Sequence, residues 1–221
     1  MLLRRISIKR NRSIKYKSSN FDWIKLNEME QNELYPVFLK LHNLNVLIVG
    51  GGNVGLEKLS FLLKSSPNAN VEVVAPDFHL EIKVLAETHP SVKLTEAKFK
   101  KRMLKKRHMV IACTDDLKVN KRVYDLSRKR YLICNIADTP DLCDYYLGGI
   151  VTKGNVKIAI STNGKSPTTA KRLREFFEEV IPEDINQMVE NLNEYRKTLK
   201  GDFEEKVKRM NEITNSLKNK E

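Results

Sequence analysis

Three glycines that follow a short apolar run constrain the fold of this 221-residue chain more than any other feature. Residues 46–49 have the pattern of a buried strand, and an amphipathic helical pattern begins just after the glycines. Gly50, Gly52 and Gly55 have the spacing G-x-G-x-x-G, in the strand-to-helix context of a dinucleotide-binding turn. Gly50 permits a sharp exit from the strand, Gly52 lets a pyrophosphate approach the backbone, and Gly55 lets the helix pack close to the sheet. Free N–H groups of the first helical turn would then face the phosphates. A glycine-rich turn that binds nothing would not require this whole context.

Composition narrows the class of protein. The hydrophobic fraction of 41% can build a core, and no apolar run approaches the ~20 residues of a membrane span. The formal net charge is +12. Residues 1–28 hold eight Lys or Arg against two acidic residues, a balance of +6, which leaves +6 for the other 193 residues. A basic body suits a polyanionic small molecule, and since no nucleic-acid-binding motif is visible we expect neither nucleic acid nor a membrane as partner.

Cysteine usage indicates the cellular compartment. The chain has three cysteines and no C-x-x-C motif. An odd number of cysteines without a secretory signal favours the reducing cytoplasm. We expect no metal site, because the four histidines are scattered along the chain.

The first 33 residues are basic and show no clean hydrophobic periodicity. They are interpreted as a disordered basic extension, as a targeting peptide, or as sequence upstream of a true start at Met29. Extension or upstream sequence is favoured, since a targeting peptide should show a cleaner amphipathic helix. Residues 34–41 are an apolar lead-in that we expect to lie extended against the sheet.

Apolar runs then alternate with helical patterns, which predicts a Rossmann-like α/β domain over residues 34–147. The predicted strands are about 44–49, 71–75, 92–94, 109–113 and 131–136, and the predicted helices are about 53–65, 78–88, 101–106 and 117–129. Ligands of such sheets bind at the carboxyl ends of the strands.

Three candidate site residues stand at those strand ends. Asp77 lies 22 positions after Gly55; it is a ribose contact, together with the backbone at Pro76, or an exposed turn aspartate. The absence of a nearby arginine favours NAD over NADP. Thr114 follows the fourth strand, where the cofactor crevice opens. Asp138 follows the fifth, where a carboxylate can take a proton beside a hydride-accepting nicotinamide, although its position alone equally fits a turn aspartate.

A change of architecture follows the sheet. Residues 148–152 and 156–160 form a hairpin around Lys-Gly-Asn, and a lone hairpin needs a partner surface such as a second chain. Residues 161–167 lead into a helix with Ser166 as its N-cap. Lys165 and Arg174, with the basic residues between them, make either an anion site suited to carboxylates or a solvated helix face. Residues 182–221 are helical and highly charged, with a break at residues 200–202.

Five sequence blocks in this order resemble the precorrin-2 dehydrogenase family, which also includes sirohydrochlorin ferrochelatases and the front part of sirohaem synthases. The resemblance covers about residues 34–220. The blocks are Gly50-Gly51-Gly52-Asn53-Val54, Val74-Ala75-Pro76, Ala112-Cys113-Thr114-Asp115-Asp116, Asn135-Ile136-Ala137-Asp138 and Ser161-Thr162-Asn163-Gly164-Lys165-Ser166-Pro167.

The resemblance implies three parts: the Rossmann domain (34–147), a small α+β dimerisation domain (148–181) and a helical domain (182–221). It implies a homodimer that oxidises precorrin-2 to sirohydrochlorin with NAD in sirohaem synthesis. Asp138 would be the general base, and in bifunctional members would assist insertion of ferrous iron. The cofactor contacts would fall on Asn53, Val54, Pro76 and Asp77. The polycarboxylate substrate would meet Thr162, Asn163, Lys165, Ser166 and Arg174.

The alternatives are a chelatase that keeps the nucleotide domain as a scaffold, and a non-enzymatic nucleotide-binding regulatory protein on the same fold. A pure sensor would need neither Asp138 nor residues 161–167. The family often has alanine at the position of Gly55, where glycine is tolerable and closer to the general G-x-G-x-x-G fingerprint.

Overall fold

The computed structural model describes residues 31–215. The predicted N-terminal extension therefore lies outside the described residues except for positions 31–33, as does the candidate start Met29. The chain divides into Met1–Glu33 and Leu34–Glu221, and only the second unit is described below. None of its described helices is both long and apolar enough to cross a bilayer.

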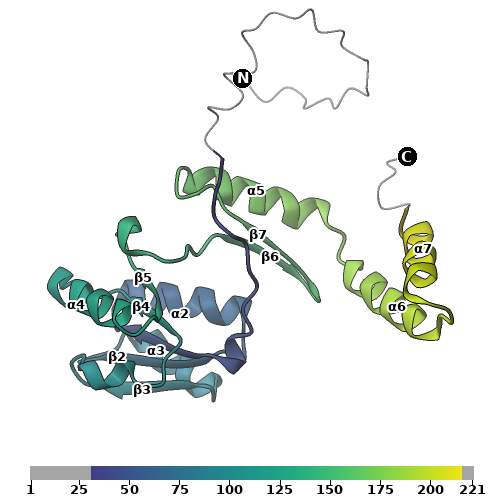
Figure 1. The fold of residues 1–221 in the computed structure, drawn as a ribbon. Helices are drawn as coiled ribbons and strands as arrows, with labels where there is room; N and C mark the ends of the chain where they lie inside the picture. Colours follow the sequence, from purple (N-terminus) through teal and green to yellow (C-terminus); the bar gives the residue numbers. More distant parts are fainter. Residues whose placement is uncertain (1–30, 216–221) are drawn as a thin grey trace, which may run out of the picture. The chain divides into compact units, whose positions relative to one another are not determined.

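Five parallel strands in the order β3-β2-β1-β4-β5 form the sheet, which confirms the predicted Rossmann-like domain (Figure 1). The strands are β1 (Asn45–Val49), β2 (Asn70–Ala75), β3 (Val92–Glu96), β4 (Met109–Ala112) and β5 (Ile133–Ile136). The connecting helices are α2 (Asn53–Ser65), α3 (Leu80–Thr88) and α4 (Leu117–Arg128), and the short 3-10 turns are η1 (Leu41–Asn43), η2 (Lys101–Leu104) and η3 (Pro140–Leu142).

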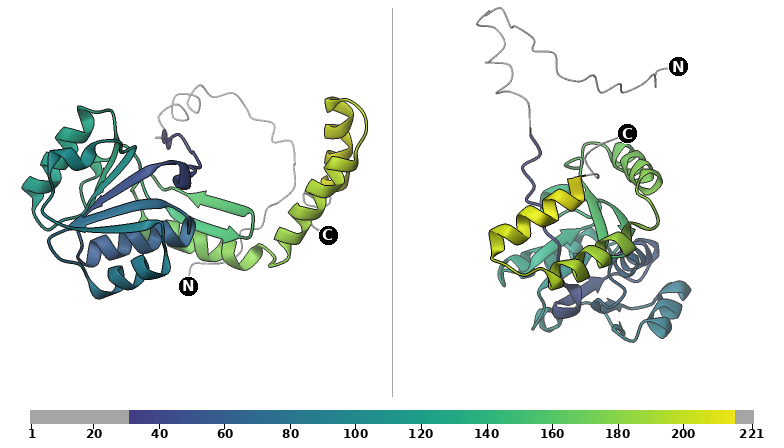
Figure 2. Two further views of the ribbon diagram at one scale, coloured as in Figure 1. Left: turned by 90° about the horizontal axis from the view of Figure 1, so that it is seen from below. Right: turned by 90° about the vertical axis from the view of Figure 1, so that its right-hand side faces the viewer.

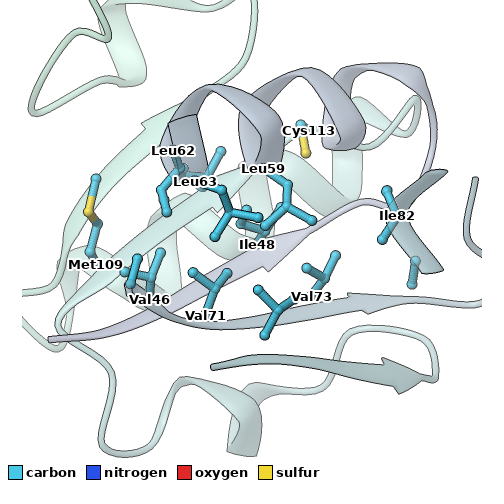
Figure 3. Close-up of a cluster of buried hydrophobic side chains, with 14 of the residues drawn as sticks. Val46, Ile48, Leu59, Leu62, Leu63, Val71, Val73, Ile82, Met109 and Cys113 are labelled. Carbon is cyan, nitrogen blue, oxygen red and sulfur yellow. The ribbon is translucent and has the colours of Figure 1, made fainter. Parts of the chain in front are cut away.

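The central strand β1 is apolar on both faces because helices cover both sides of the sheet. Val46 and Ile48 face the leucines of α2 together with Ile82 of α3, as Figure 3 shows. Leu47 and Val49 face the opposite way, toward a second cluster that includes Leu104 of η2 and Val123 of α4. The short run of four branched residues is thus a strand because each side chain enters one of two cores.

A two-stranded antiparallel hairpin follows, β6 (Gly149–Lys153) and β7 (Val156–Ile160). Helix α5 (Pro167–Val180) packs along it, and the two lie side by side in Figure 2. The approach is close at Gly149, where a Cβ would lie 3.3 Å from the Ala170 carbonyl oxygen. The ammonium group of Lys157 joins the hairpin to the Rossmann domain by donating to the carbonyl oxygen of Ser65, the last residue of α2.

Helices α6 (Ile185–Thr198) and α7 (Phe203–Ile213) form the predicted helical end of the chain. The break between them is at Gly201, whose φ is +112°. Asp202 then caps α7 by accepting from the Glu205 N–H at 2.9 Å. The hairpin turn rests on the start of α6, where Asn186 accepts from the Asn155 N–H at 2.7 Å.

Three local expectations are wrong. The lead-in at residues 34–40 carries no regular structure and does not pack on the sheet, since Tyr35 and Phe38 are exposed by 87% and 68%. The predicted helix 101–106 is only the 3-10 turn η2. The fifth strand begins at Ile133 rather than at Tyr131, whose φ of +57° is incompatible with a strand.

Candidate functional site

The glycine loop between β1 and α2 has the geometry of a phosphate cradle. Gly50 adopts φ +133°, and a Cβ there would lie 2.6 Å from the Cys113 carbonyl oxygen. Gly52 is the opposite case, because a Cβ at this position would meet nothing within 4 Å. The space in front of Gly52 is therefore open to a ligand, and the N-terminus of the 13-residue helix α2 begins there, with Asn53 and Val54 as its first residues.

The close packing predicted at Gly55 is present in the structure. A Cβ on Gly55 would lie 2.3 Å from the carbonyl oxygen of Gly50, so alanine cannot be accommodated without a shift of the loop. This close approach is what lets the first turn of α2 pack directly against the end of β1.

Gly51, for which no role was predicted from the sequence, allows the turn after β2 to pack against the glycine loop. A Cβ on Gly51 would lie 2.3 Å from the Asp77 carbonyl oxygen, and its own carbonyl accepts from the His79 N–H at 2.7 Å. Pro76 and Asp77 thus lie next to the glycine loop, as predicted for a ribose contact.

The Asp77 carboxylate is exposed at this turn. One oxygen accepts from the Phe78 N–H at 2.7 Å, and the Lys83 ammonium lies 4.0 Å from the same oxygen. From the sequence, NAD was favoured over NADP because no arginine was found nearby. In the structure Lys83 supplies a cation beside Asp77 instead. The ribose role of Asp77 stays a prediction.

Thr114 is held at the end of β4 by a buried asparagine that sequence reasoning missed. Asn120 accepts from the Thr114 hydroxyl at 2.7 Å and from its N–H at 3.1 Å, and donates to its carbonyl oxygen at 2.8 Å. Asn120 is 3% exposed, and the signal for it was a polar residue on the apolar face of a predicted helix. Asp116 caps the same helix by accepting from the N–H groups of Lys118 and Val119.

The predicted base, Asp138, leaves the sheet beside Thr114. Ile136 pairs with Ala112 in the register of β5 and β4, and Asp138 and Thr114 each lie two residues further on, so both stand at the carboxyl edge where such sheets bind ligands. Asp138 is exposed and adopts φ +58°. Within residues 31–215 its carboxylate has neither a hydrogen bond nor an ion pair, which leaves it available to a substrate.

The chain after Asp138 folds back along its own strand. The Asp144 N–H donates to the Cys134 carbonyl oxygen at 2.8 Å, and its carboxylate accepts from the Cys134 N–H at 2.9 Å. Asn135, which is buried, donates to the Tyr145 carbonyl oxygen at 2.9 Å. Residues 137–145 therefore form a closed loop, which we call the aspartate loop, with Asp138 on its outer side.

The residues predicted to bind substrate form a second cluster on the loop after β7 and on α5. Thr162 and Ser166 are occupied by one another: the Thr162 hydroxyl donates to the Ser166 carbonyl oxygen at 3.1 Å and accepts from its N–H at 3.3 Å. The Ser166 hydroxyl also caps α5 by accepting from the Thr169 N–H at 3.2 Å, which confirms the predicted N-cap. Asn163 adopts φ +53° at the tip of the loop.

The positive charges of α5 are largely paired within the helix. Arg172 and Lys171 lie 2.7 Å and 4.0 Å from the Glu175 carboxylate, and Arg174 pairs with Glu178. In a single chain this cluster therefore resembles the solvated helix face as much as an anion site. Its role in binding substrate stays a prediction. Within the described part of the chain no three His, Cys, Asp or Glu side chains gather closely enough to hold a metal ion.

Comparisons with known proteins agree with this geometry. Residues 37–149 match a family model described as NAD(P)-binding, and residues 153–179 match the central region of a sirohaem biosynthesis protein. The chain is 33% identical over 165 residues to a sirohaem synthase of Nitrosococcus oceani, covering 75% of this chain and 35% of that protein. It is 38% identical over 173 residues to a sirohaem synthase of Pseudoalteromonas translucida, covering 78% and 34%. The chain thus spans about a third of the length of these relatives.

Among solved structures, the chain is similar to a precorrin-2 dehydrogenase. The two share 27% sequence identity and a TM-score of 0.66, and the match covers 81% of this chain and 89% of the other. The similarity therefore extends beyond the glycine loop to most of both chains.

Proposed function

This chain belongs to the NAD(P)-binding family, and from that premise we propose that it is an NAD-dependent dehydrogenase that oxidises precorrin-2 to sirohydrochlorin. The single observation that carries the proposal is the open space in front of Gly52, at the same carboxyl edge of the sheet as Asp138, whose carboxylate has neither a hydrogen bond nor an ion pair within residues 31–215. A cofactor seated in the glycine cradle and a base beside it are the two parts that such an oxidation needs.

The residues of the cradle fit NAD. The backbone at Gly50, Gly52 and Gly55 leaves room for the pyrophosphate, and the first N–H groups of α2, at Asn53 and Val54, are directed to it. The bound nicotinamide supplies a hydride acceptor. Thr114, fixed by Asn120, lines the edge of the crevice.

Asp138 acts as the general base. Oxidation removes a hydride and a proton from the tetrapyrrole, so that precorrin-2 and NAD give sirohydrochlorin, NADH and a proton. The exposed carboxylate accepts the proton and then releases it to solvent. Because Asp138 is free of partners within residues 31–215, no existing ion pair has to break before it can do so.

The substrate carries carboxylates, and the second cluster is the part of the chain suited to them. Asn163 and Lys165 lie on the loop before α5, whose conformation Thr162 and Ser166 hold, and Arg174 lies two turns into the helix. A substrate carboxylate would compete with Glu178 for Arg174.

The protein acts as a homodimer in the cytoplasm, through the hairpin and α5 (residues 148–181), with residues 182–221 as a helical domain. Leu173, Phe176 and Val180 form an apolar stripe on α5 and are 39%, 54% and 50% exposed in the single chain. Such a stripe is expected to be covered by another chain. The cysteines at positions 113, 134 and 143 are all free, as suits a reducing compartment.

An anaerobic assay tests the function directly. Purified protein, precorrin-2 and NAD should yield NADH and sirohydrochlorin in equal amounts. Ferrous iron is then added as a second substrate, and formation of sirohaem would show the chelatase step as well. Absence of NADH, with iron still inserted into supplied sirohydrochlorin, would refute the dehydrogenase and favour the chelatase scaffold.

A further inference from the structure

The aspartate loop holds Asp138 in a backbone conformation that needs support. A non-glycine residue at φ +58° is uncommon, although aspartate tolerates it better than most residues. Such conformations persist where the surrounding structure holds them, and they cluster at functional sites. The Asp138 side chain has neither a hydrogen bond nor an ion pair within residues 31–215, so we look for this support in the rest of the loop.

The side chain inside the loop is Cys143. Its Sγ lies 3.3 Å from the carbonyl oxygen of Ile136 and 3.3 Å from that of Thr139. These two carbonyls flank Ala137 and Asp138, so the sulfur bridges the two ends of the segment that carries the carboxylate. The amide of Asn135 donates to the same sulfur at 3.4 Å.

We propose that Cys143 is a positioning residue for Asp138: its thiol spans the aspartate loop and fixes the direction of the carboxylate. The inference rests on the proposed function. The two carbonyls already accept backbone N–H groups, from Thr139 and Leu142, so the thiol adds no missing partner. It fills the space between the Ile136 and Thr139 carbonyls and so supports the backbone conformation of Asp138, whose φ is +58°.

The chemistry of the thiol suits this role. Burial raises the pKa of Cys143, so the sulfur keeps its proton at neutral pH and can donate to one carbonyl at a time. Removing the sulfur leaves space between the Ile136 and Thr139 carbonyls, while the side chains of Asn135 and Asp144 still close the base of the loop. A displacement of about 1 Å of a catalytic group can lower turnover about 100-fold.

The first test compares Cys143→Ala with Cys134→Ala, a control that removes a buried thiol from the preceding strand. Cys143→Ala should lower kcat at least about tenfold, while the KM for precorrin-2 and the Kd for NADH change less than about twofold. Cys134→Ala loses core packing, and folded protein should keep its kcat. Cys143→Ser, which retains a donor of similar size, should recover most of the turnover. Equal losses in the serine and alanine variants, or a kcat for Cys143→Ala near that of the wild type, would overturn the inference.

A second measurement does not depend on the alanine variant folding. Methyl methanethiosulfonate converts the accessible thiol into a mixed disulfide, which removes the donor and enlarges the side chain. Wild-type turnover should fall as Cys143 is labelled and return on reduction, while Cys143→Ser should be insensitive. Full labelling of Cys143 without loss of turnover would overturn the inference. Wild-type protein that never produces NADH from precorrin-2 would instead refute the proposed function, and this inference with it.

Discussion

Replacement of Gly52 by alanine should lower the affinity for the cofactor without changing the stability of the fold. The position has φ −86° and ψ −162°, which alanine can adopt, and a Cβ there meets nothing within 4 Å. Alanine reduces the freedom of the unfolded chain by about 0.4–1 kcal/mol, and it is a poorer N-cap than glycine. These effects oppose one another, so the melting temperature of Gly52→Ala should stay within about 4 °C of the wild type.

The affinity for NADH should fall sharply in the same variant. The added methyl group occupies the space through which a diphosphate reaches the N-terminus of α2, so at least one charge-assisted hydrogen bond is lost. Such a bond contributes about 1.5–3 kcal/mol, which corresponds to a loss of about 10- to 150-fold in affinity.

Isothermal titration with NADH and thermal unfolding measure the two effects. The matched variant is Gly55→Ala, where the Cβ lies 2.3 Å from the Gly50 carbonyl oxygen. It should lower stability by about 1–3 kcal/mol through overpacking. If Gly52→Ala binds NADH as tightly as the wild type, the diphosphate does not lie over Gly52 and the assigned cradle is wrong.

Four further predictions concern other parts of the chain. Asp138→Ala should lower kcat by about 10²- to 10⁴-fold and leave NADH affinity nearly unchanged; unchanged turnover in the anaerobic assay would refute its role as base. Asn120→Ala should cost about 1–3 kcal/mol in urea unfolding, because the N–H and carbonyl of Thr114 lose their partner. Phe176→Glu should shift the sedimentation coefficient to that of a monomer, and an unshifted dimer would place the interface elsewhere. Burial would raise the pKa of Glu72, but hydrogen bonds from Thr95 and Arg107 and the charge of Arg107 outweigh it and lower the pKa from 4.5. Because the folded pKa lies below the unfolded one, this stability is present above pH 4.5 and is lost as pH falls through the lower folded value. Glu72→Gln should therefore be less stable at neutral pH and should show less acid dependence in urea titrations; equal slopes would contradict the assignment.

The parts of the fold that depend on local pattern were predictable from the sequence. Strand β1 and helix α2 follow from apolar periodicity and the glycine spacing, and the N-cap Ser166 follows from residue type at a helix start. Each of these features is determined by residues within a few positions of one another.

The features that sequence reasoning missed depend on partners that only the fold brings near. Gly51 is required by the Asp77 carbonyl 26 positions away, and the aspartate loop closes through contacts between Asn135 and Tyr145. Conversely, Thr162 and Ser166 were assigned to substrate, yet in the structure the Thr162 hydroxyl bonds within the loop and the Ser166 hydroxyl caps α5. A polar residue in sequence does not reveal whether its partner is a ligand or the backbone.

The contact between Lys157 and Ser65 joins the hairpin to the end of α2 that lies farthest from the diphosphate cradle. Helix α2 is a rod of about 20 Å, with the diphosphate cradle at its first turn and the Lys157 ammonium against its last carbonyl. If the proposed second subunit displaces the hairpin when it binds, the Lys157 contact would transmit that displacement to the far end of this rod. We therefore expect dimer assembly and nucleotide affinity to be coupled, and a titration of either against the other would test this.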